Sequence, residues 1–119
     1  MAIGIGTSGS GDGSTAIPLA GTAAAPHAVG TLNVLAATKT TQPMQIAVQG
    51  LDRGLYAVYL VHNGRAWEKC GTFTVKNPAG GRPTTINSPY RAKTGDTWVV
   101  TKQLPGRHKA GPVVLRPNA

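Results

Sequence analysis

An Asn-Gly pair between two strand-like runs constrains the fold of this chain more than any other local feature. Asn63-Gly64 is typical of a two-residue hairpin turn, because both residues tolerate the positive φ angles of that turn. Residues 55–62, just before it, are apolar on both faces of an extended chain, which predicts a central strand covered on both sides. After the turn, Phe73 and Val75 alternate with threonines, as in a returning strand. We therefore expect an antiparallel hairpin inside a β-sheet.

The same period of two recurs elsewhere along the chain. Met44, Ile46 and Val48 alternate with polar residues and predict a half-buried strand. Sixteen glycines and nine prolines among 119 residues favour turns and short strands over long helices. We expect further strands near residues 29–36, 83–87, 97–102 and 112–116, and an edge strand near residues 16–20. The pattern predicts an all-β fold, an antiparallel Ig-like β-sandwich of about seven or eight short strands.

Composition shifts divide the chain into three parts. Residues 1–15 predict a flexible Gly/Ser linker, because they hold too little apolar area to offset the entropy of ordering them. Residues 16–28 are small, apolar and interrupted by two prolines, which predicts an extended lead-in. Residues 29–119 form the expected β-sandwich domain. We expect the lead-in or a partner chain, such as a second copy, to cover the outer face of the 55–62 strand.

The charge balance argues against an enzyme and suggests anionic partners. Only four acidic residues oppose twelve Lys and Arg, so little material exists for a carboxylate active site. The first 52 residues hold one cation, whereas the remaining residues hold eleven cations against two acids. This asymmetry allows a polyanion surface, although scattered cations also serve simply to keep a domain soluble. The candidate partner-binding or polyanion-binding residues are Arg65, Lys69, Arg91, Lys93, Arg107 and Lys109.

The remaining motifs give no cofactor or metal site. Gly4–Gly9 matches G-x-G-x-x-G literally, but no strand precedes it and no helix follows, so it is interpreted as linker. Type-1 copper would need a Met after the cysteine, and the three His are too dispersed for zinc. Cys70 is expected to be a buried, inert thiol, although His62 could approach it across the hairpin. We expect no catalytic, metal or cofactor residues.

One stretch resembles a known family. Leu51, Tyr56 and Gly64, followed by Gly71-Thr72-Phe73, stand where the extracytoplasmic domains of transmembrane anti-sigma factors of the anti-sigma-K factor type have equivalent residues. Tyr59 stands where that family usually has tryptophan. The resemblance covers about residues 28–116 and consists mostly of structural glycines and core positions.

This resemblance implies a non-enzymatic regulatory or sensor domain on the extracytoplasmic face of a bacterial membrane, within a single-pass protein. The Gly/Ser linker after residues 2–6 is what such a protein has just outside its membrane helix. Sigma-factor binding would belong to another part of the full-length protein. The expected partners are a protein and an anionic lipid or cell-wall polymer, and nucleic acid is not expected. Two alternatives are a freestanding exported Ig-like binding or scaffold module and a basic polyanion-binding or nucleic-acid-binding domain.

Overall fold

The computed structural model describes residues 15–80, 82–92, 95–103 and 111–117. These residues form strands, turns and loops without a helix, so the described part of the chain holds no helix that could cross a membrane. The eight strands are β1 (Thr15–Gly21), β2 (Val29–Val34), β3 (Gln42–Gln49), β4 (Gly54–His62), β5 (Ala66–Val75), β6 (Thr84–Ser88), β7 (Asp96–Lys102) and β8 (Val113–Pro117). The predicted all-β fold and its number of strands are confirmed.

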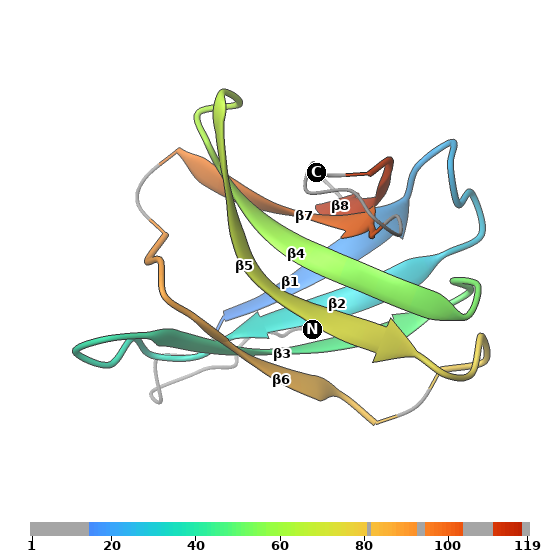
Figure 1. The fold of residues 1–119 in the computed structure, drawn as a ribbon, viewed down its shortest axis with the longest axis horizontal. Helices are drawn as coiled ribbons and strands as arrows, with labels where there is room; N and C mark the ends of the chain where they lie inside the picture. Colours follow the sequence, from blue (N-terminus) through green and yellow to red (C-terminus); the bar gives the residue numbers. More distant parts are fainter. Residues whose placement is uncertain (1–14, 81, 93–94, 104–110, 118–119) are drawn as a thin grey trace, which may run out of the picture.

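The strands pair antiparallel in one sheet of order β5-β4-β7-β8-β1-β2-β3-β6. The β1–β8 ladder runs over residues 19–21 of β1. On either side of this ladder lie two halves of the sheet, β5-β4-β7-β8 and β1-β2-β3-β6, which face each other (Figure 1). The two edge strands, β5 and β6, also pack together. A Cβ atom on Gly71 of β5 would lie 2.5 Å from Cγ2 of Ile86 in β6, so this close approach depends on glycine. The sandwich is therefore a single, nearly closed sheet.

Strand β4 is buried on both faces, as its apolar sequence predicts. Tyr56, Val58 and Leu60 point into the main core between the two halves of the sheet. Ala57 and Tyr59 belong instead to a second buried cluster with Val61 and Val99. Because β4 lies between β5 and β7, its backbone hydrogen bonds are satisfied on both edges. The strand is the centre of its half of the molecule.

The β4–β5 hairpin has the turn that its sequence predicts. Asn63 and Gly64 adopt φ angles of 51° and 74°, the left-handed pair of a primed turn. The Arg65 N–H donates a hydrogen bond to the His62 carbonyl oxygen at 2.9 Å. This turn brings the C-terminal end of β4 against the N-terminal end of β5.

A β-bulge farther along the hairpin changes the phase of β5. Val58 lies opposite Gly71 while Tyr59 lies opposite Lys69, so Cys70 is the extra residue. In a regular strand, residues 70 and 73 would point to opposite faces. The bulge lets both Cys70 and Phe73 enter the main core, where each is 5% exposed.

The expected edge strand near residues 16–20 is present as β1, but it is not at an edge. It lies between β2 and β8, with Ile17 opposite Leu32 and Ala20 opposite Arg116. Pro18 pairs with Thr31 of β2, and the described ladder to β8 begins at the next residue. Proline has no N–H to donate, and the ladder to β8, as far as the structure describes it, does not include Pro18. The predicted lead-in is in part a structural strand.

Candidate functional site

The structure describes three of the six predicted cationic residues. Arg65 is exposed in the β4–β5 turn, and Lys69 donates a hydrogen bond to Gln103 Oε1 at 3.0 Å. Arg91 follows β6 and donates to the carbonyl oxygen of Thr38. The other three candidates, Lys93, Arg107 and Lys109, lie outside the described residues. A continuous basic patch therefore stays a prediction.

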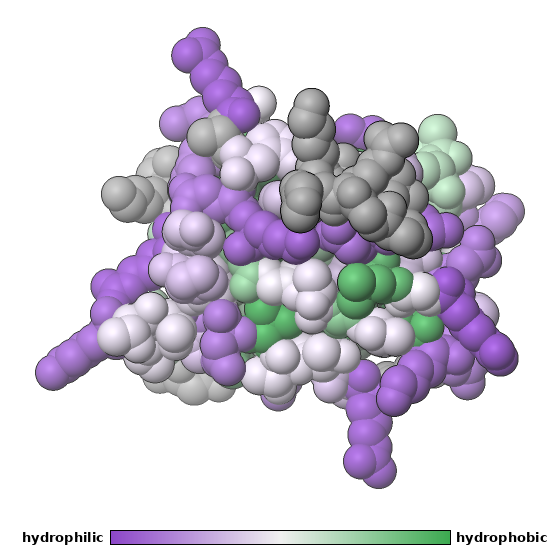
Figure 2. All heavy atoms as spheres, viewed as in Figure 1, coloured by the Kyte–Doolittle hydropathy of each residue, from purple (hydrophilic) through white to green (hydrophobic). Residues whose placement is uncertain are grey.

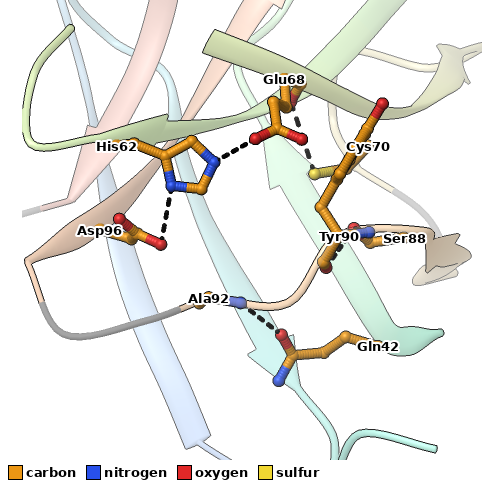
Figure 3. Close-up of polar contacts among 8 residues, drawn as sticks. All are labelled: Gln42, His62, Glu68, Cys70, Ser88, Tyr90, Ala92 and Asp96. Carbon is orange, nitrogen blue, oxygen red and sulfur yellow. Dashed lines mark hydrogen bonds and ion pairs between the residues drawn. The ribbon is translucent and has the colours of Figure 1, made fainter. Parts of the chain in front are cut away.

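A histidine held between two carboxylates lies at the end of the same hairpin (Figure 3). His62 Nδ1 lies 3.0 Å from Asp96 Oδ2, and His62 Nε2 contacts Glu68 Oε1. Strand register explains the geometry, because Asp96 of β7 is directly opposite His62, and Glu68 of β5 lies diagonally across the hairpin. Two of the four acidic residues of the chain thus converge on one imidazole.

Both ring nitrogens of His62 are engaged, and this decides its chemistry. The hydrogen bond that His62 donates to Asp96, then the one that it donates to Glu68, and the negative charge of both carboxylates raise the pKa of His62 above its ordinary value. An imidazolium donating from both nitrogens has no lone pair for a substrate proton or a metal ion. In the described residues no group of three or more His, Cys, Asp or Glu side chains is placed to hold a metal. The arrangement is an ionic clasp joining β4, β5 and β7.

Cys70 lies beside this clasp but is not a partner of His62. Its thiol donates to the Glu68 carbonyl oxygen at 3.6 Å. Burial raises the pKa of the Cys70 thiol, so it stays protonated at neutral pH. The nearby Ser88 hydroxyl donates to the Tyr90 carbonyl oxygen at 2.7 Å and accepts from the Tyr90 N–H at 3.0 Å. The Ser88 hydroxyl thus holds the start of the segment that carries Arg91.

A hollow of about 480 Å³ opens next to the clasp. His62 and Glu68 form one side, and the exposed ring of Tyr90 with Arg91 forms another. The 35–41 turn contributes the third side, and its Thr38 hydroxyl accepts from the Thr41 N–H at 3.0 Å. The full lining is Lys39, Thr40, His62, Glu68, Pro89, Tyr90 and Arg91. Two cations, a carboxylate and an aromatic ring therefore face one opening.

A second feature lies on the outer face of β4 and β7. The outer cluster of Ala57, Tyr59, Val61 and Val99 is bordered by Trp67, which is 41% exposed. The Trp67 and Tyr59 rings are 5.8 Å apart between centroids. A hollow of about 430 Å³ lies beside Trp67, and Thr22, Ala23, Ala24, Val99, Val113 and Arg116 line the rest of it. We call this region the Trp67 face.

The Trp67 face includes part of the predicted lead-in. Residues 22–24 line its hollow together with Val99 and Val113. An exposed tryptophan beside an apolar cluster makes this face a candidate docking surface. Figure 2 shows a view of the molecule in which some hydrophobic atoms are exposed near the centre with hydrophilic groups around them.

Comparison with known proteins adds no relative. No family model, curated protein or solved structure matches the chain. The resemblance to anti-sigma factors therefore stays a prediction, and function has to be argued from the geometry.

Proposed function

We propose that this chain is a non-enzymatic docking and sensor domain on the extracytoplasmic side of a membrane-anchored anti-sigma factor. In this proposal the domain binds a protein partner outside the membrane, and its occupancy changes the release of a sigma factor on the other side. The Trp67 face is the observation that carries the proposal, because a half-exposed tryptophan beside an apolar cluster provides an anchor for a partner.

The chemistry of the described residues favours binding over catalysis. The carboxylate-bearing cluster uses both nitrogens of His62 for structure. The Cys70 thiol is buried and held in its protonated form. Neither group offers the free lone pair or thiolate that acid–base or nucleophilic catalysis requires.

The full-length gene provides the first test. An encoded membrane helix upstream of this domain and an adjacent sigma-factor gene would support the anti-sigma proposal. A secretion signal without either feature would favour the freestanding exported module instead.

Substitution of Trp67 provides the second test, in cells that carry the full-length gene and a reporter for the cognate sigma factor. Trp67→Ala removes the anchor and should change reporter output under inducing conditions, because partner affinity falls. Val29→Ala is the matched control, since Val29 is 51% exposed and is not among the residues of the Trp67 face. Equal reporter output from wild type, Trp67→Ala and Val29→Ala would contradict docking through the Trp67 face.

A further inference from the structure

We propose that the hollow beside His62 binds an acidic sugar unit, meaning a sugar that carries a carboxylate or phosphate group. The proposal deepens the proposed function, on which it rests for its biological role, by naming the class of ligand that the sensor detects. It uses a different surface from the Trp67 face, because the residues that line the two hollows do not overlap.

The anionic group of the ligand would lie between Lys39 and Arg91. Both side chains are exposed and line the same hollow, although they are far apart in sequence. The Arg91 guanidinium donates to the Thr38 carbonyl oxygen, which holds it against the turn that carries Lys39. A guanidinium has five N–H donors, so others remain for a carboxylate or phosphate oxygen.

The rest of the lining fits a sugar ring better than a bare anion. The Tyr90 ring, with the residue 39% exposed, offers a flat apolar surface, and the Thr40 hydroxyl both donates and accepts. Glu68 contacts His62 through one carboxylate oxygen, and its second oxygen can accept from a ligand hydroxyl. A simple inorganic anion would contact only the two cations, whereas a neutral sugar would contact only the ring, the Thr40 hydroxyl and Glu68. An acidic sugar satisfies all of these groups.

The clasp makes this binding dependent on protonation. His62 faces Glu68 of β5 and Asp96 of β7, and Lys39 and Arg91 are the other charged groups of the hollow. The protonated imidazole offsets one of the two carboxylate charges. Loss of its proton makes the hollow more negative by one charge, so affinity for an anionic ligand should fall as the pH rises through the raised pKa of His62.

Calorimetric or NMR titration of the full chain with four probes tests the proposal. D-glucuronate and glucose 6-phosphate are the acidic sugars, and glucose and inorganic phosphate are the matched controls. We expect at least one acidic sugar to bind with a Kd on the order of 1 mM, as an open site gives for a small ligand, and at least tenfold more tightly than either control. Comparison of the two acidic sugars distinguishes a carboxylate-bearing from a phosphate-bearing ligand.

Substitutions in the lining test whether the acidic sugar binds in the hollow beside His62. Lys39→Ala and Tyr90→Ala should each weaken binding by about tenfold, since each removes a charged or aromatic contact. Lys76→Ala removes an equally exposed cation that lines a different hollow and should leave the affinity unchanged. A urea unfolding curve for each variant shows whether it is folded, and Lys39→Glu provides a second, charge-reversed variant.

Several results would overturn the proposal. The first is that glucose or inorganic phosphate binds as tightly as the acidic sugars. The second is that neither acidic sugar binds at tens of millimolar. The third is that Lys39→Ala and Lys76→Ala weaken the binding of an acidic sugar by the same factor. Affinity that does not fall between pH 6 and pH 9 would remove the role of His62. If acidic sugars fail to bind while Trp67→Ala still alters the reporter, only the ligand class is wrong. If they bind and Trp67→Ala leaves the reporter unaffected, the sugar site is supported and docking through the Trp67 face is contradicted.

Discussion

Gly50 is the position where a single methyl group should be most informative about how the segment before β2 packs against the end of β3. Its φ angle is +82°, and its N–H donates to the Pro78 carbonyl oxygen at 2.8 Å. A Cβ atom at Gly50 would lie 2.8 Å from the His27 carbonyl oxygen and 3.0 Å from the Ala28 Cα. Both neighbours are backbone atoms of the segment that continues from residues 22–24, so neither can move by rotating a side chain.

The cost of Gly50→Ala follows from two unfavourable contributions and one favourable contribution. A left-handed φ angle costs an alanine about 1–2 kcal/mol. Crowding against backbone adds about 1–3 kcal/mol. The lower entropy of alanine in the unfolded chain returns about 0.4–1 kcal/mol. We therefore expect Gly50→Ala to lower the free energy of unfolding by about 1–5 kcal/mol.

Gly64→Ala is the matched control for this prediction. Gly64 has a similar φ angle of +74°, but a Cβ atom there would meet nothing within 4 Å. Gly64→Ala should lower the free energy of unfolding only by the cost of the left-handed φ angle, about 1 kcal/mol. Urea unfolding at constant pH measures both variants, with unchanged m-values showing that the unfolded state is comparable. Equal losses in the two variants, within about 0.5 kcal/mol, would refute the proposed crowding at Gly50.

Three further predictions concern buried or clasped groups. Because the pKa of His62 is raised in the folded state, its stabilising contribution is complete below about pH 6.5 and is lost as the pH rises through the folded-state pKa. The urea midpoint of wild type should therefore exceed that of His62→Gln by more at pH 6 than at pH 9. A difference that is the same at both pH values would contradict the clasp. The Thr101 hydroxyl oxygen is buried without a hydrogen-bond partner, so Thr101→Val should be neutral or stabilise by about 1 kcal/mol in the same assay, and a clear loss would contradict this. Cys70 should react with an aromatic disulfide reagent much more slowly in the native protein than in urea, and equal rates would show that the thiol is accessible.

The local features of the fold could be predicted from the sequence because they depend on neighbouring residues. Asn63-Gly64 defines its turn through the φ angles that these residues tolerate. The central position of β4 follows from the apolar residues on both of its faces. The Glu68–His62 contact could also have been found, since the hairpin register places Glu68 diagonally opposite His62.

The rest depends on contacts between distant segments, which local patterns do not encode. Asp96 meets His62 only because β7 pairs with β4. Arg91 reaches the turn that carries Lys39 across 53 positions of sequence. The bulge at Cys70 changes the phase of β5, and Gly71 beside it does not by itself distinguish a bulge from the close approach of another strand. The small number of acidic residues gives no indication that two of them converge on one side chain.

Transcription controlled by the cognate sigma factor tests the central claim most directly. The comparison is between cells carrying the full-length gene and cells in which residues 15–117 are deleted, with the rest of the protein retained and its abundance checked. If this chain is an extracytoplasmic regulatory domain, deletion should abolish the change in sigma-dependent transcription between inducing and non-inducing conditions. An unchanged response after deletion would contradict the account.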